Sequence, residues 1–140
     1  MKSISYLSLI LTFLLVLASC KKDSNEKDLT PNGILTSHGW KISSYSQIDL
    51  NLKETIYTPT SCESDDYTIF KSDDTYKLSR GSIKCTQSET DKTGTWSLSD
   101  DGKTFSLDGL SYSILTLETT TFVIKYSIGA AGFKYSYIPN

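Results

Sequence analysis

Beyond residue 39 the chain alternates apolar and polar residues with a period of two, which is the period of a β-strand and not of an α-helix. The pattern is clearest at residues 121–128 and 133–137, where nearly every second side chain is aromatic or aliphatic. Shorter alternating runs occupy residues 95–99 and 104–107. Such runs indicate strands that bury one face.

Turn residues separate these runs. Asp108-Gly109 is typical of a tight two-residue hairpin turn, and further turn signals lie at residues 99–102 and 129–132. Within residues 110–117 the apolar positions change from one face to the other, which predicts a β-bulge or a bend. Only residues 33–38 are predicted to form a helical turn.

About nine short strands are predicted. They are residues 40–48, 52–57, 67–71, 75–79, 95–99, 104–107, 110–117, 121–128 and 133–137. Short strands joined by short turns are typical of a small antiparallel barrel or sandwich. We expect an all-β domain built as an up-and-down β-barrel, with a β-sandwich as the alternative.

The first residues have a different pattern. Lys2 precedes an apolar run at residues 4–17, which is too short to span a bilayer and is typical of an export signal. The run ends in Leu17-Ala18-Ser19-Cys20, which resembles the site at which bacterial lipoproteins are lipidated and cleaved. We expect residues 1–19 to be removed and Cys20 to carry the lipid, including fatty acyl chains such as palmitate. The alternative is an ordinary cleaved signal followed by a chance cysteine.

The segment after Cys20 is charged and has few large apolar residues, so residues 20–32 are predicted to be a flexible tether and residues 33–140 the folded domain. The lipid would anchor the protein to a membrane of the cell envelope. Cys20 is followed by Lys21 and Lys22 and not by the aspartate that resembles an inner-membrane retention signal, so the outer membrane is favoured. Periplasmic and surface-facing orientations both stay open.

Charge and cysteine content reduce the number of functions that are compatible with the sequence. The whole chain has 14 basic and 16 acidic residues, which does not favour a nucleic-acid partner. Besides Cys20, the only cysteines are Cys62 and Cys85, and outside the inner membrane a disulfide is the expected state of such a pair. A metal pair or a catalytic thiol is the alternative, but His38 is the only histidine available to either.

The sequence favours no enzyme class, metal or cofactor. A nucleophilic triad would have to use His38, which lies at the start of the domain and is predicted to be a solvated turn residue. Three acidic pairs, beginning at Asp65, Asp73 and Asp100, fall in predicted turns, where we expect them to cap local amides. No glycine-rich phosphate loop joins a strand to a helix.

Aromatic residues are the remaining candidates for a site. Most aromatic side chains of a small barrel pack in its core, but tyrosine and tryptophan also line ligand pockets. The residues that we expect at such a pocket are Trp96, Tyr126, Phe133, Tyr135 and Tyr137.

The order of several motifs resembles a known family. Trp40 lies in the first strand, Cys62 and Cys85 follow, and Gly94-Thr95-Trp96 begins a later strand. This arrangement resembles the lipocalin-like domain of small Bacteroidetes lipoproteins and extends over nearly all of the folded domain. The resemblance implies an up-and-down barrel with a pocket at one end, and it implies no particular ligand.

Three functions are compatible with these observations. The first is a monomeric carrier that binds a small apolar or amphipathic molecule. The second is a protein-interaction or inhibitor module that uses the loops within residues 58–90, because loops commonly carry function. The third is a glycan-binding accessory, which predicts a flat exposed tryptophan or tyrosine platform and loses its main support if Trp40 and Trp96 are both buried. We favour the carrier.

Overall fold

The computed structural model describes residues 30–140, so the signal, Cys20 and most of the tether lie outside the described residues. Within them the chain forms one short helix followed by nine strands. The elements are α2 (Pro31–Thr36), β1 (Trp40–Ile48), β2 (Glu54–Tyr57), β3 (Tyr67–Phe70), β4 (Thr75–Ser79), β5 (Lys92–Leu98), β6 (Thr104–Leu107), β7 (Leu110–Glu118), β8 (Thr121–Ile128) and β9 (Ala131–Pro139).

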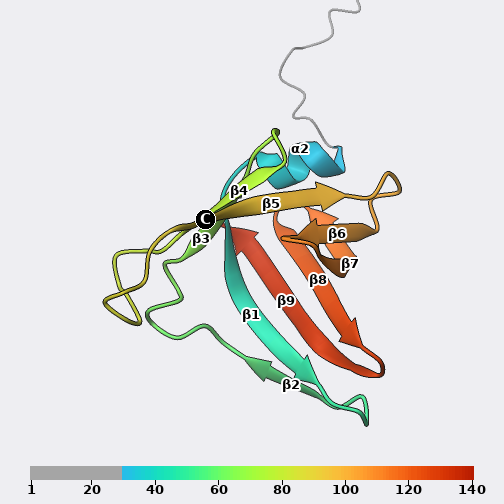
Figure 1. Cartoon of the computed structure of the whole chain (residues 1–140). Coiled ribbons are helices and arrows are strands. Elements are labelled where there is room, and N and C mark those ends of the chain that lie inside the picture. Colours follow the sequence, from blue (N-terminus) through green and yellow to red (C-terminus); the bar gives the residue numbers. More distant parts are fainter. Residues whose placement is uncertain (1–29) are drawn as a thin grey trace, which may run out of the picture.

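The strands form one antiparallel sheet that closes on itself (Figure 1). Neighbouring strands follow the order β2-β1-β3-β4-β5-β6-β7-β8-β9, and β9 also pairs with β1. Eight strands therefore complete the ring, and β2 lies outside it as a second partner for the far half of β1. This topology confirms the all-β prediction and the barrel over the sandwich.

The barrel has two different ends, because successive connections alternate between them. At the helix end, α2 lies near the short β3–β4, β5–β6 and β7–β8 turns (Figure 1). The loop end carries the β1–β2, β6–β7 and β8–β9 turns and the two longest connections, residues 58–66 and 80–91. The helix begins with Thr30, whose Oγ1 accepts a hydrogen bond from the amide of Gly33, and with Pro31 in the first turn. The helix itself runs from Pro31 to Thr36, two residues earlier than the helical turn predicted at residues 33–38.

Local turn chemistry places the strands as expected. Asp108 and Gly109 both have positive φ angles, 49° and 83°, as a type I′ turn between β6 and β7 requires. The β7–β8 register shifts between Ile114 and Thr116, which confirms the bulge predicted in that strand. A second shift, between Ile42 and Ser44 in β1, was not predicted.

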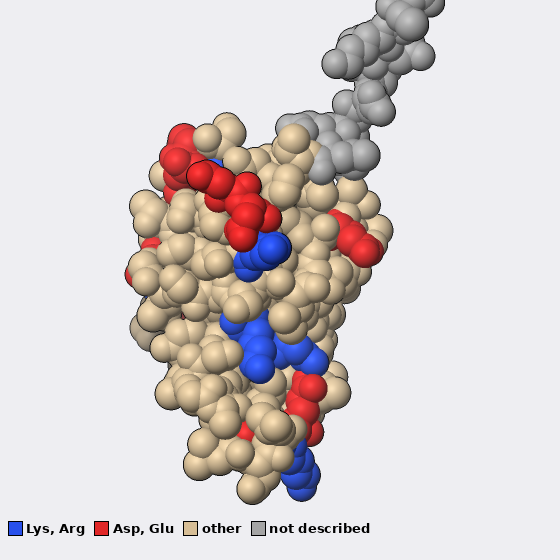
Figure 2. Space-filling model, turned by 90° about the vertical axis from the view of Figure 1, so that its right-hand side faces the viewer, with Lys and Arg blue, Asp and Glu red and all other residues tan. Residues whose placement is uncertain are grey.

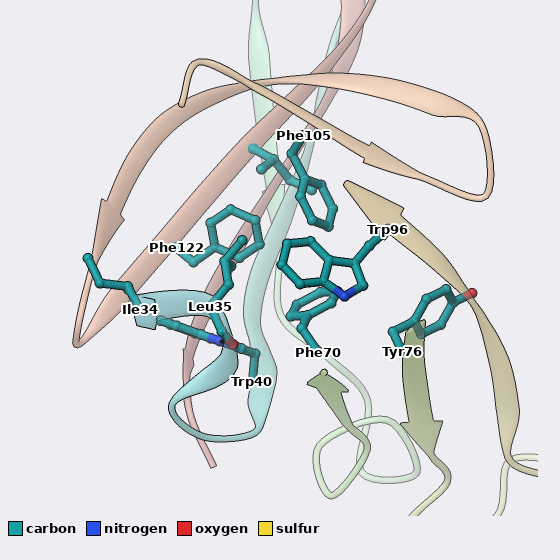
Figure 3. Close-up of a cluster of buried hydrophobic side chains, with 9 residues drawn as sticks. Ile34, Leu35, Trp40, Phe70, Tyr76, Trp96, Phe105 and Phe122 are labelled. Atoms are coloured by element: carbon teal, nitrogen blue, oxygen red, sulfur yellow. Dashed lines mark hydrogen bonds between the residues drawn. The ribbon is translucent and has the colours of Figure 1, made fainter. Parts of the chain in front are cut away.

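Aromatic side chains fill the helix end of the barrel (Figure 3). Phe70 lies at its centre and makes edge-to-face contacts with Trp96, Phe105 and Phe122, with ring centroids 5.4 to 6.4 Å apart. Trp40 is fully buried below α2, and its indole nitrogen donates a hydrogen bond of 3.0 Å to the carbonyl of Leu35. The helix therefore covers this end of the barrel and the rings packed beneath it.

The surface carries no broad field of one sign on the face shown in Figure 2, where basic side chains lie between acidic ones. No helix among residues 30–140 is long and apolar enough to cross a membrane.

Candidate functional site

A cavity of about 350 Å³ lies inside the barrel, between the aromatic core and the loop end. Its inner limit is formed by Trp40 and Tyr76, which belong to the core. Its outer limit is formed by residues of the two long loops, among them Pro59 and Glu63. The interior of the barrel is thus divided into a packed half and a hollow half.

One wall of the cavity is rich in tyrosine and is formed by the long strands β1, β7 and β9. Tyr45, Tyr112 and Tyr137 all line it. In the β1–β9 register Ile42 lies opposite Tyr137, and Tyr45 lies opposite Tyr135. The unpredicted bulge between Ile42 and Ser44 permits this, because without it Tyr45 would point to the outside of the barrel.

The facing wall carries smaller side chains, most of them aliphatic. Thr68 of β3, Leu78 of β4 and Leu107 of β6 line the cavity from this side. Thr68 and Leu78 are direct partners in the β3–β4 register, so they present neighbouring side chains to the interior. The two walls together give a lining of phenol rings on one side and aliphatic groups on the other.

A disulfide joins the two long loops at the mouth of the cavity. Cys62 in residues 58–66 is bonded to Cys85 in residues 80–91, with the two Cα atoms 5.1 Å apart. This confirms the disulfide prediction. The bridge connects loops that are adjacent in space because β3 and β4 form a hairpin between them.

Asp65 and Asp66 add hydrogen bonds between the same two loops. Asp65 accepts from the amides of Ser82 and Ile83, at 2.7 and 3.1 Å, and Asp66 accepts from the amide of Gly81 at 2.9 Å. These bonds lower the pKa of Asp65, chiefly through the Ile83 amide. The prediction that this acidic pair caps local amides was therefore wrong, since its partners are on the other loop. Asp73 and Asp101, by contrast, do cap amides within their own turns.

Two polar pairs reach into the cavity. Arg80 forms an ion pair with Asp66, and both side chains are largely buried. The hydroxyl of Tyr76 donates a 2.6 Å hydrogen bond to Asp108. Burial, and then this bond, raise the pKa of Tyr76 to about 12, while the same bond lowers the pKa of Asp108. Tyr76 is therefore a neutral hydrogen-bond donor across the physiological pH range.

Gly94 is required by the Tyr76–Asp108 pair. A Cβ atom at this position would lie 2.1 Å from Oδ1 of Asp108 and 2.6 Å from Cε1 of Tyr76. Both neighbours are held by their mutual hydrogen bond, and the amide of Thr95 also binds Asp108. Gly94→Ala is expected to lower the free energy of unfolding by about 1–3 kcal/mol, as overpacking usually does, measured by urea denaturation. Thr93→Ala, at an exposed position of the same strand, is the control and should change it far less.

The residues predicted to form a pocket lie in three places. Tyr137 lines the cavity, and Tyr126 and Tyr135 lie beside it, with their rings 5.7 and 6.3 Å from that of the cavity residue Tyr112. Phe133 is 37% exposed, further along β9 towards the loop end. Trp96 does not line the cavity.

Trp96 is instead part of the aromatic core. Its indole nitrogen donates to the carbonyls of Lys71 and Thr75, at 3.1 and 3.0 Å, and only 4% of the residue is exposed. These contacts join β5 to the β3–β4 turn. Its position is structural, and no ligand in the cavity would reach it without displacing the core.

Sequence reasoning missed the polar residues of the site. Arg80 follows Tyr76 and Leu78 at intervals of two, so a continued alternation would have placed it inside the barrel. Asp66, directly before β3, precedes Thr68 by the same interval of two. Both were overlooked because charged residues at strand ends usually indicate solvent.

The described residues show no arrangement of metal ligands. No group of three or more histidine, cysteine or acidic side chains is close enough to hold an ion in residues 30–140. His38 lies at the helix end, where its Nδ1 is 2.7 Å from Oγ of Ser37 and its ring is 4.3 Å from that of Trp40. It is therefore at the opposite end from the cavity.

An up-and-down ring of eight strands, closed by a helix at one end and hollow at the other, defines a class of small β-barrels with an internal cavity. The sequence matches the family described as the lipocalin-like domain over residues 37–124, which is more than half of the chain. The chain belongs to this family. A search of curated proteins found no match.

Proposed function

We propose that this protein binds a small apolar or amphipathic molecule in the barrel cavity. The observation that carries the proposal is a preformed cavity of about 350 Å³, within the range usual for sites of small ligands. Its lining supports the proposal, because aliphatic and phenol groups predominate and a few polar groups converge at one end. The family also favours this reading, since a lipocalin-like domain suggests a barrel that binds small ligands.

We also propose that the barrel acts at a membrane of the cell envelope, as a lipoprotein of the Bacteroidetes type. The support is the sequence alone: an apolar export signal that ends at Cys20, followed by a charged tether. A lipid on Cys20 would hold the carrier next to the membrane, where apolar molecules concentrate. Mass spectrometry of the protein from its own membranes would test this through the added mass at Cys20.

The alternative functions differ in their support. Trp40 and Trp96 are both buried, so the glycan-binding hypothesis loses its main support. A protein-interaction role keeps one observation in its favour, a group of exposed apolar side chains at the loop end. They include Leu50, Leu52, Ile56, Ile83, Leu110 and Ile128.

Filling the cavity tests the carrier directly. Thr68 lines the cavity, whereas Thr93 is exposed on the outer face of β5. We expect Thr68→Trp to weaken binding of the uncharged fluorescent probe N-phenylnaphthylamine by about tenfold or more, because the new ring occupies the same space, and Thr93→Trp to leave binding unchanged. The measurement is a fluorescence titration of the protein from residue 21 onward, which retains the closed barrel and its whole core.

Two results would contradict the proposal. The unmodified protein could give no saturable probe binding, or Thr68→Trp and Thr93→Trp could bind the probe equally well. In either case the cavity is not a ligand site, and the exposed loop end becomes the favoured functional surface.

A further inference from the structure

The carboxylates that line the cavity are already engaged by the protein. Glu63 accepts hydrogen bonds from the amide and the hydroxyl of Thr60, at 2.9 and 2.8 Å, and these bonds lower the pKa of Glu63. Asp66 accepts from Arg80 and the amide of Gly81, and Asp108 accepts from Tyr76 and the amide of Thr95. Each of the three carboxylates therefore has at least two donors from the protein itself.

Arg80 differs from these carboxylates, because the protein does not use all of its hydrogen-bond donors. Its Nη1 atom binds Asp66. Its Nε atom is buried and has no hydrogen-bond partner among residues 30–140. A guanidinium has five N–H donors in a fixed plane, and a buried donor without an acceptor is costly. Nε itself is closed to solvent, so a ligand would meet the other donors of the guanidinium, of which only Nη1 is bonded within residues 30–140, and Arg80 lines the cavity.

Lys92 adds a second positive charge on the adjacent strand. It lines the cavity and lies opposite Leu78 in the β4–β5 register. Arg80 follows Leu78 by two residues, directly after the end of β4. Lys92 forms none of the ion pairs found in the described part of the chain. The polar end of the cavity thus offers free donors from two cationic side chains.

We propose that the ligand of this cavity is an amphiphile with an acidic head group, whose oxygen atoms accept hydrogen bonds from Arg80 with Lys92 beside them. The apolar part then lies deeper, between Leu78, Leu107 and Tyr137. The inference rests on the proposed carrier function and specifies its ligand class. Three carboxylates and two cations line the cavity, so selectivity for an acid comes from these direct hydrogen bonds and not from the net charge.

Three ligands with the same tail and different heads test the proposal. Dodecanoate, dodecanol and dodecylamine are used to displace N-phenylnaphthylamine from the protein, followed by probe fluorescence. Dodecanoate is expected to displace the probe at about tenfold lower concentration than either of the others, the gain of one charge-assisted hydrogen bond. Equal potency of the three, or preference for the amine, would overturn the inference.

Arg80→Gln is expected to bring the potency of dodecanoate to that of dodecanol, with both potencies measured against the probe affinity of the variant itself. Lys103→Gln, in the exposed β5–β6 turn at the helix end, is the matched control and should retain the preference for the acid. Loss of the acid preference in the control variant as well would contradict a role for Arg80.

Arg80→Gln leaves Asp66 without its ion pair and can thereby perturb the loops, so a second variant is needed. Lys92→Gln breaks no ion pair and is expected to reduce the acid preference in part.

Different results refute the carrier function and the proposed ligand class. Absence of probe binding to the unmodified protein refutes the carrier function, whereas probe binding without acid preference refutes only the ligand class.

Discussion

Trp40→Ala is expected to lower the free energy of unfolding by about 3–5 kcal/mol, as removal of a large buried aromatic side chain usually does. Trp40 is fully buried, its ring centroid lies 5.7 Å from that of Phe122, and its indole nitrogen binds the carbonyl of Leu35. The substitution would therefore open a cavity in the core and release the helix that closes the barrel. Urea denaturation followed by tryptophan fluorescence from Trp96 measures the change.

Two further variants separate the contributions at this position. Trp40→Phe retains most of the packing and loses the hydrogen bond to Leu35, so it should cost less than Trp40→Ala. Ile138→Ala removes an apolar side chain that is 39% exposed near the same end, and should stay within about 0.5 kcal/mol of the unmodified protein. A loss for Trp40→Ala as small as that of the Ile138 variant would show that α2 and its contacts contribute little to the fold.

Removal of the disulfide is the second substitution with a large expected effect. Cys62→Ser combined with Cys85→Ser should lower the free energy of unfolding by about 3 kcal/mol, because the bridge closes a loop with a sequence separation of 23 residues. The bridge also connects the loops at the cavity mouth, so these loops should become more susceptible to protease in the variant. Denaturation with and without a reducing agent gives an independent measurement on the unmodified protein.

The serine variant and the reduced protein should agree, since both lack the same covalent link. The reducing agent should have no effect on the serine variant itself, which serves as its control. Equal stability of the oxidised and reduced protein would mean that the hydrogen bonds of Asp65 and Asp66 suffice to hold the two loops together.

Much of the barrel could be predicted because strand period and turn chemistry are local properties. The bounds predicted for β1, β4, β6 and β8 agree with the structure. β5 begins at Lys92, three residues earlier than predicted, and β9 extends two residues beyond the prediction at each end. These ends lack a clear alternation of apolar and polar residues, so only their pairing with neighbouring strands determines them.

The site was predicted less completely because it depends on contacts between distant segments. The alternating aromatics of β8 and β9 correctly indicated the interior face of the barrel. Whether an interior side chain packs in the core or borders the cavity depends on its neighbours from other strands, which alternation does not encode. Trp96 and Tyr137 share the same pattern in the sequence, yet one packs with Phe70 and the other borders free space.

The bulge in β1 was also difficult to predict, because it depends on pairing with a distant strand. Trp40, Ile42 and Tyr45 are apolar at intervals of two and then three, and the odd interval is the only sign of the register shift in β1. A single serine inserted between two pairs of facing residues determines which face Tyr45 occupies. The pairing partner, β9, lies about 90 residues further along the chain.

The pairing of β1 with β9 also determines how the chain must fold. Trp40 lies opposite Pro139, about 100 residues away in the sequence, so the ring closes through one of the longest loops available to the domain. Until residues 131–139 are in place, β1 and β8 each present an open edge of unpaired amides and carbonyls, which can pair with another chain. A chain that ends before β9 would therefore form an open sheet, whose two unpaired strand edges favour aggregation.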